Sequence, residues 1–168
     1  MYTIAAELPE EAGEIEALLD RAFGPDRHGK TVYRLRQGVE PVRELCFTLR
    51  NADGLIASIR YWPVLIGTAM PALLLGPIGV EPAVQGKGYG VALMTYSLAQ
   101  ARAQGHRIVL LVGDHDYYAR FGFTRAATDG LSLPGPVDRN RFLGLELEPG
   151  ALAGVTGLVG QARCLRAA

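Results

Sequence analysis

Three glycines at alternating positions, Gly86, Gly88 and Gly90, follow an apolar run that ends at Val80 and precede a segment with helical spacing. An order of strand, glycine-rich loop and helix N-terminus is typical of phosphate binding, because unpaired backbone N–H groups and the helix dipole point at one spot. Glycine also lets a diphosphate approach the backbone closely, and Lys87 adds positive charge at the rim. This stretch therefore predicts a site for a phosphorylated ligand.

The spacing of the loop separates several kinds of phosphate site. The dinucleotide fingerprint GxGxxG needs a third glycine at position 91, where Val91 stands. The triphosphate loop fails twice, because Glu81 occupies the position of its first glycine and Gly88 that of its Ser or Thr. A glycine-rich turn without any ligand is the remaining alternative.

The loop reads Gln85-Gly86-Lys87-Gly88-Tyr89-Gly90, a Gln-x-x-Gly-x-Gly pattern that follows Val80-Glu81-Pro82. In this order it resembles the GNAT superfamily of acyl-coenzyme A-dependent N-acetyltransferases. The resemblance implies that the loop amides hold the pyrophosphate of acetyl-coenzyme A and that the preceding strand hydrogen-bonds its pantetheine arm. The residues so implied are Ile78, Gly79 and Val80 for the pantetheine, and Gln85, Gly86, Lys87, Gly88, Tyr89 and Gly90 for the pyrophosphate.

A second match is the run Tyr118-Ala119-Arg120-Phe121-Gly122-Phe123, which resembles the family's Tyr-x-x-x-Gly-Phe. The resemblance implies that the Tyr118 hydroxyl faces the cofactor sulfur and protonates the departing thiolate. A phenol titrates near ~10 and a thiol near ~8.5, so a neutral tyrosine is available to donate at neutral pH. A Tyr–Phe pair packed in the core is the alternative, and Tyr117 is the neighbour most easily confused with Tyr118.

The match departs from the family pattern in two places. Gly113 and Asp114 stand where many members carry an asparagine, and no carboxylate occurs from Pro71 to Val80, so the strand-borne general base is missing. A base is useful because an amine with a pKa near ~10.4 is mostly protonated at neutral pH. The candidates for that role are Glu44, Glu81, Asp114, His115 and a water chain.

The sequence contains no metal-ligand spacing of His and Cys and no Gly-x-Ser-x-Gly nucleophile motif. We therefore expect direct attack of a primary amine on acetyl-coenzyme A in a ternary complex, without a metal. A module that senses acyl-coenzyme A without turnover is the alternative, and another phosphate-ligand enzyme is a third interpretation. The acceptor stays open between small amines, amino acids, aminoglycoside-like molecules and protein lysines or N-termini.

The composition is that of a soluble globular protein: 49% of the 168 residues are hydrophobic, and 17 Lys and Arg balance 17 Asp and Glu. Zero net charge gives no general attraction to nucleic acid or an anionic membrane. Cys46 and Cys164 lie far apart and no signal sequence is present, which favours a reducing cytoplasm. Prolines and glycines interrupt the uncharged run between Arg60 and Glu81, so we expect two buried strands there rather than a membrane span.

Hydrophobic spacing predicts the elements that position these residues. Strand patterns occur at Ile4–Ala6, Glu44–Arg50, Leu55–Trp62, Pro71–Val80, Ile108–Val112, Phe123–Ala126 and Arg141–Leu147. Helical patterns occur at Pro9–Phe23, Gly29–Gln37, Val91–Gln104 and Asp114–Phe121. In the second helix we expect Val32 and Leu35 to face inward and Lys30, Arg34 and Arg36 to face outward. The five aliphatic residues from Ile108 predict a strand that is covered on both faces.

These elements predict one mixed α/β domain, and the resemblance implies a GNAT-like fold with a central, mostly antiparallel sheet flanked by helices. The domain is expected over residues 1–148, with a tail of uncertain order at 149–168. The apolar tail and exposed strand edges favour a homodimer. Gly76-Pro77 predicts a bulge. By resemblance, such a bulge separates its strand from Ile108–Val112 and opens a slot for the pantetheine.

Overall fold

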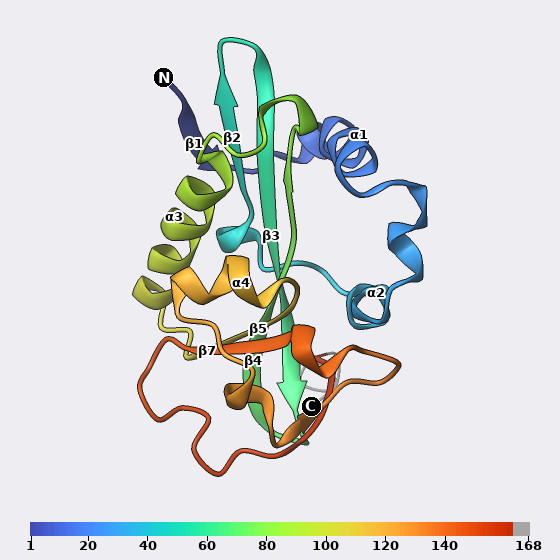
Figure 1. Ribbon diagram of the computed structural model, residues 1–168, viewed down its shortest axis with the longest axis vertical. Coiled ribbons are helices and arrows are strands. Elements are labelled where there is room, and N and C mark those ends of the chain that lie inside the picture. The colour runs from blue at the N-terminus through green and yellow to red at the C-terminus, as the bar shows by residue number, and fades with distance from the viewer. Residues whose placement is uncertain (163–168) are drawn as a thin grey trace.

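A long antiparallel hairpin of β3 (Gly54–Ile66) and β4 (Met70–Val80) forms the centre of the structure, as Figure 1 shows. The computed structural model describes residues 1–162. The uncharged run between Arg60 and Glu81 lies in this hairpin, which confirms the predicted pair of buried strands. In the described part of the chain, no helix combines the length and the apolarity needed to cross a membrane.

Four further strands extend the hairpin into a mixed sheet. They are β1 (Thr3–Ala6), β2 (Phe47–Asn51), β5 (Ile108–Val112) and β7 (Phe142–Glu146). The strands follow the order β1-β2-β3-β4-β5-β7, and along this path β4 and β5 are the parallel pair. The mostly antiparallel sheet with flanking helices confirms the expected fold class.

Helices cover both faces of the sheet. They are α1 (Ala12–Phe23), α2 (Thr31–Arg36), α3 (Tyr89–Ala103) and the short α4 (His115–Tyr118). Short 3-10 turns lie at Pro9–Glu11, Pro25–Gly29, Arg43–Leu45, Pro82–Val84, Ala119–Phe121, Ala126–Thr128 and Arg139–Arg141. In Figure 1, α3 lies on one side of the β3–β4 hairpin, and α1 and α2 lie on the other.

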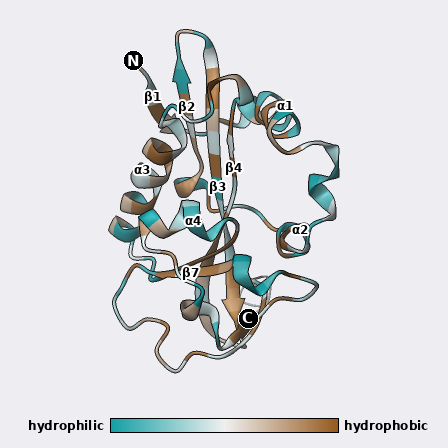
Figure 2. Cartoon of the chain, in the orientation of Figure 1, coloured by the Kyte–Doolittle hydropathy of each residue, from teal (hydrophilic) through white to brown (hydrophobic). Residues whose placement is uncertain are grey.

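The side chains of β5 alternate between two hydrophobic cores. Val109 and Leu111 pack in the core that includes residues of α3, and Ile108 and Leu110 pack in the core that includes residues of α2. Successive side chains of a strand point to opposite faces of the sheet. This alternation confirms the predicted strand covered on both faces. Hydrophobic colours also follow β3 and β7 in Figure 2.

The region after α4 differs from the sequence-based prediction. Phe123–Ala126 is not a strand, since Thr124 forms only an isolated β-bridge with Gly144. The Thr124 hydroxyl accepts a hydrogen bond from the Ala127 N–H, which lies in the 3-10 turn Ala126–Thr128. A hydroxyl that satisfies a backbone donor locally competes with strand pairing.

The C-terminal part of the described chain adds two strands that the sequence analysis did not predict. β8 (Gly157–Gln161) pairs with the end of β3 and with the short β6 (Leu131–Ser132). Val159 of β8 is fully buried in the core that includes residues of α2. Cys164 and the last residues of the expected tail lie outside the described residues.

β4 is irregular at Gly76-Pro77, as predicted. The register between β3 and β4 shifts between Ile59 and Tyr61, at the level of this dipeptide. β5 pairs with β4 at Leu73 and Leu74 and not beyond them within residues 1–162. The two parallel strands therefore separate after Leu74, which opens space between them.

Candidate functional site

The glycine loop borders an open hollow of about 630 Å³ at the N-terminus of α3. Seven of the nine expected cofactor residues line this glycine hollow, namely Ile78, Val80, Gln85, Gly86, Gly88, Tyr89 and Gly90. The other two point elsewhere: Lys87 is exposed outside the lining, and Gly79 faces α1, where an added Cβ would lie 2.8 Å from Leu19.

The loop has the features of an anion site. Gly86 and Gly88 have φ angles of 82° and 89°, a conformation that favours glycine, and a Cβ added to either would meet no atom within 4 Å. Within residues 1–162, the backbone N–H groups of Gly86, Lys87 and Gly88 donate to no other backbone group. Because α3 begins at Tyr89, its dipole adds positive potential at the same place. Free donors beside open space suit a diphosphate.

Two side chains shape the glycine hollow further. The Gln85 Nε2 donates to the Val80 carbonyl at 3.2 Å and so ties the loop to the end of β4. Arg120 also lines the hollow, with its guanidinium 4.7 Å from the centre of the Tyr117 ring. Arg120 thus brings to the hollow the positive charge that the sequence analysis expected from Lys87.

A narrower cavity of about 130 Å³, the slot, lies where β4 and β5 separate. Tyr118 lines the slot together with Ile78 and Leu111, and its ring also packs 6.0 Å from that of Phe123. Burial raises the pKa of Tyr118 to about 12, so the phenol is neutral at pH 7. Tyr117 lines the glycine hollow instead. The structure therefore assigns the two neighbouring tyrosines to different cavities.

The four residues expected as base candidates line neither the glycine hollow nor the slot. Glu81 forms an ion pair with Arg21 at 2.8 Å, and the Asp114 carboxylate caps α4 by accepting from the Asp116 N–H at 3.2 Å. His115 lies 3.7 Å from the Asp116 carboxylate, and Glu44 is exposed. No group of three or more His, Cys, Asp or Glu among residues 1–162 is arranged to hold a metal ion.

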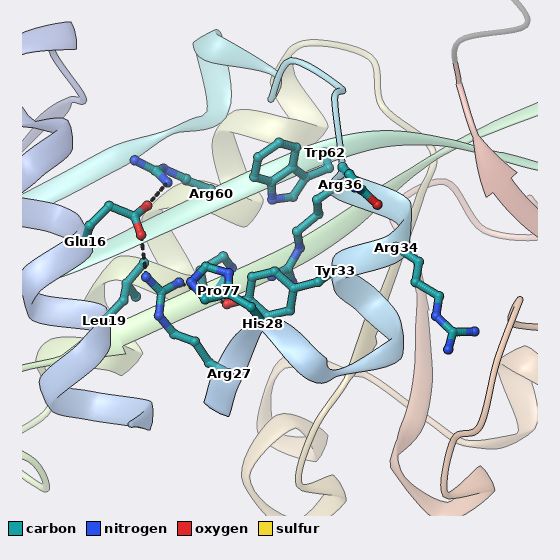
Figure 3. Close-up of a pocket in the computed structure, with 11 residues that line it drawn as sticks. Glu16, Leu19, Arg27, His28, Tyr33, Arg34, Arg36, Arg60, Trp62 and Pro77 are labelled. Carbon is teal, nitrogen blue, oxygen red and sulfur yellow. Dashed lines mark hydrogen bonds and ion pairs between the residues drawn. The ribbon is translucent and has the colours of Figure 1, made fainter. Parts of the chain in front are cut away.

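A third cavity of about 430 Å³, the arginine pocket, lies among α1, α2 and β3 (Figure 3). It is lined by Glu16, Leu19, Arg27, His28, Tyr33, Arg34, Arg36, Gln37, Arg60, Trp62 and Pro77. Arg27 pairs with Glu16 and with Asp20, and Arg60 pairs with Glu7 at 2.8 Å and with Glu16 at 3.2 Å. Burial works against ionisation of Glu16, but the hydrogen bonds from Arg27 and Arg60 lower its pKa. Two arginines therefore already share this carboxylate.

Arg36 corrects the prediction that it faces outward. Its side chain is buried, and only 8% of the residue is exposed. The guanidinium lies 4.7 Å from the centre of the Tyr33 ring and 5.9 Å from that of Trp62. Gly76 makes room for it, because an added Cβ would lie 2.9 Å from the Arg36 Nη2. Burial lowers the pKa of Arg36 to about 10.

The three cavities adjoin one another. Phe23 and Ile78 line both the glycine hollow and the slot. Arg36 and Pro77 line both the slot and the arginine pocket. The slot with Tyr118 therefore lies between the glycine hollow and the arginine pocket.

Comparison with known proteins shows the family of the chain. Residues 8–126 match the family model described as an acetyltransferase (GNAT) domain. The chain belongs to the GNAT acetyltransferase family. This GNAT enzyme is 32% identical over 158 residues to the uncharacterized N-acetyltransferase YhbS of Escherichia coli K12, and the match covers 93% of each chain.

Two solved structures resemble this GNAT enzyme over almost its whole length. The structure of Escherichia coli YhbS in complex with CoA matches with a TM-score of 0.81 at 30% identity and covers 98% of this chain and 92% of that one. A Brucella melitensis GNAT acetyltransferase in complex with acetyl-CoA matches with a TM-score of 0.71 at 29% identity, covering 98% of both chains.

Sequence reasoning missed the cationic residues of this GNAT site. Arg120 lies within the Tyr-x-x-x-Gly-Phe run, so its position in that motif could have indicated a place near the cofactor. Arg36 lies four residues after the inward-facing Val32, and that spacing places both side chains on one helix face. Arg60 is an isolated charge in a strand-like apolar stretch, a further sign of a specific partner.

Proposed function

We propose that this GNAT enzyme transfers the acetyl group of acetyl-coenzyme A to a primary amine by direct attack in a ternary complex. One observation carries the proposal: the glycine hollow, the slot with Tyr118 and the arginine pocket are neighbouring cavities that share lining residues. Such a series suits a diphosphate, a thioester and an acceptor in that order. The relatives whose structures contain CoA or acetyl-CoA support the same ligand.

The residues around the glycine hollow fit coenzyme A. The free N–H groups of the loop and the N-terminus of α3 are donors for a diphosphate, and Arg120 adds charge. Beyond Leu74 the backbone of β4 no longer pairs with β5 in the described structure, so main-chain groups near Ile78 are available to the amides of the pantetheine. Acetyl-coenzyme A supplies the activated thioester.

Tyr118 is the proposed general acid. It lines the slot between the expected diphosphate and acceptor positions, and its raised pKa keeps the phenol protonated. The Tyr118 phenol gives its proton to the sulfur as the C–S bond breaks, and the proton that the amine loses on forming the amide returns the phenolate to a phenol, so the completed step leaves no net charge in the slot. A general acid of this kind contributes about 10²- to 10⁴-fold to the rate.

Release of free thiol across a panel of primary amines tests the proposal. Tyr118→Phe should lower kcat by about 10²-fold or more while leaving coenzyme A affinity unchanged. Tyr96→Phe is the matched control, because Tyr96 lines neither the glycine hollow, the slot nor the arginine pocket. Wild-type turnover by Tyr118→Phe would remove Tyr118 as the acid, and ping-pong kinetics or an acetylated enzyme would exclude direct attack.

The alternative function is an acyl-coenzyme A sensor without turnover. A sensor needs no proton donor near the thioester, whereas Tyr118 lies in the slot. Tight coenzyme A binding with no thiol release for any amine would favour the sensor. The cytoplasmic location and the homodimer expected from the sequence stay predictions, and size measurement in solution tests the dimer.

A further inference from the structure

The arginine pocket holds a buried guanidinium without a carboxylate partner. The Nε and Nη1 atoms of Arg36 are inaccessible to solvent and have no hydrogen-bond partner among the described residues. Arg27 and Arg60, in contrast, each pair with two carboxylates. Arg36 is thus the buried cation of this pocket whose charge the described residues do not neutralise.

The groups that face Arg36 do not provide a counter-charge. The rings of Tyr33 and Trp62 lie on it, and Glu16 is already bonded to Arg27 and Arg60. The other basic residues of the lining, His28 and Arg34, supply no negative charge, and the exposed Arg34 donates to the Pro134 carbonyl at 2.9 Å. A buried charge without a partner is costly unless a ligand supplies the opposite charge.

The position of Arg36 indicates which ligand supplies that charge. Its side chain borders both the arginine pocket and the slot that contains Tyr118 (Figure 3 shows the pocket side). An anion held there leaves the rest of its molecule within reach of the proposed thioester position. The pocket of about 430 Å³ has the size of a small-molecule site, and Tyr33 and Trp62 give it aromatic walls.

We propose that Arg36 binds the carboxylate of the acceptor, which is a small amine of the amino-acid class. This inference rests on the proposed acetyl transfer. One buried, unpaired guanidinium matches one monoanion, whereas a phosphate dianion would need a second cation beside it, and the Arg34 side chain is directed away from Arg36 (Figure 3). The carboxylate at Arg36 then orients the amine toward the slot.

Matched pairs of amines with and without the carboxylate test the proposal. L-Phenylalanine is compared with phenethylamine, and L-leucine with isopentylamine, as acceptors in the thiol-release assay. The wild type should favour at least one amino acid by about tenfold or more in kcat/KM, and Arg36→Gln should remove this preference. Arg43→Gln is the control, since Arg43 pairs with Glu40 on the exposed surface.

A second measurement needs no acetyl transfer. Calorimetry of 3-phenylpropionate against 3-phenylpropanamide isolates recognition of the carboxylate from catalysis. We expect the wild type and Arg43→Gln to bind the carboxylate at least tenfold more tightly than the amide, and Arg36→Gln to bind both alike. Unchanged coenzyme A affinity and thermal unfolding would verify that Arg36→Gln is folded.

The outcomes separate this inference from the proposed function. Turnover of the neutral amines that equals or exceeds that of both amino acids, or an amino-acid preference that survives Arg36→Gln, would overturn the carboxylate site and leave acetyl transfer standing. Equal binding of 3-phenylpropionate and 3-phenylpropanamide by the wild type would also overturn it. Selective 3-phenylpropionate binding in a protein that neither binds coenzyme A nor releases thiol would support an Arg36 anion site and refute the proposed function.

Discussion

Replacing Arg36 with methionine should stabilise the protein, although it removes a buried side chain. Methionine is unbranched and flexible, so it can fill the space between Tyr33 and Trp62 without bringing a charge. Burial lowers the pKa of Arg36 from the ordinary value of arginine to about 10. Because the folded-state pKa is the lower one, the cation destabilises the fold fully below about pH 10, and this effect fades as the pH rises from there to the ordinary pKa of arginine.

The size of the expected stabilisation follows from the lowered pKa of Arg36. The difference between its folded and ordinary pKa corresponds to about 3 kcal/mol of destabilisation at pH 7. Loss of the cation–π contacts of Arg36 with Tyr33 and Trp62 offsets about 1 kcal/mol. We therefore expect the free energy of unfolding to rise by about 2 kcal/mol, and Tm by about 4–8 °C for a chain of this length.

Urea unfolding at pH 7, followed by circular dichroism, measures this change. Arg60→Met is the matched control, because Arg60 pairs with Glu7 at 2.8 Å and the Glu7 side chain is only 3% exposed. Removing Arg60 leaves that carboxylate buried without its partner and should cost about 3–5 kcal/mol. An Arg36→Met variant that loses stability as Arg60→Met does would refute the reasoning, since Arg36 would then be neutralised in the free protein.

Two further predictions concern Tyr118. Gly113→Ala should lower kcat at least tenfold without changing coenzyme A affinity in calorimetry, because the new Cβ would lie 2.5 Å from the Tyr118 Cε2 and displace the ring. Gly13→Ala is the control, since its Cβ would meet no atom within 4 Å. A wild-type kcat in Gly113→Ala would contradict the prediction. Burial raises the pKa of Tyr118 to about 12, so its stabilising contribution is complete below pH 10 and is lost as the pH rises toward 12. The phenolate absorbance missing from Tyr118→Phe should appear near pH 12, and a difference near pH 10 would refute the shift.

The sequence predicted the parts of the fold that local rules determine. The strand of five aliphatic residues from Ile108 is covered on both faces, and Gly76-Pro77 disturbs the register of β4 as expected. The strand expected at Phe123–Ala126 was wrong, because the Thr124 hydroxyl satisfies a turn locally. β8 was missed because its partner β3 is distant in the sequence and its partner β6 is short. The residues around β8 are rich in Gly and Ala, so the alternating hydrophobic pattern of a strand is weak there.

The prediction that Arg36 faces outward was wrong, because it followed from the charge of the side chain and not from its helical spacing. Val32 and Arg36 are four residues apart and share a face, so the two criteria conflict at this position. Tertiary structure resolves the conflict: Tyr33 and Trp62 enclose the guanidinium, and Gly76 in β4 leaves space for it. Neither β3 nor β4 can be placed against α2 from local pattern, so the sequence alone does not reveal this enclosure.

Two glycines outside the Gln85–Gly90 loop make room for the side chains on which the proposed chemistry depends. A Cβ at Gly76 would lie 2.9 Å from the Arg36 Nη2, and a Cβ at Gly113 would lie 2.5 Å from the Tyr118 Cε2. Gly113 is one of the two residues, with Asp114, at which the sequence departs from the asparagine of the resembled pattern, and a side chain at Gly113 would meet the ring of the proposed acid. In the proposed enzyme, the loop glycines admit the diphosphate, while Gly113 and Gly76 admit the acid and the acceptor-binding cation.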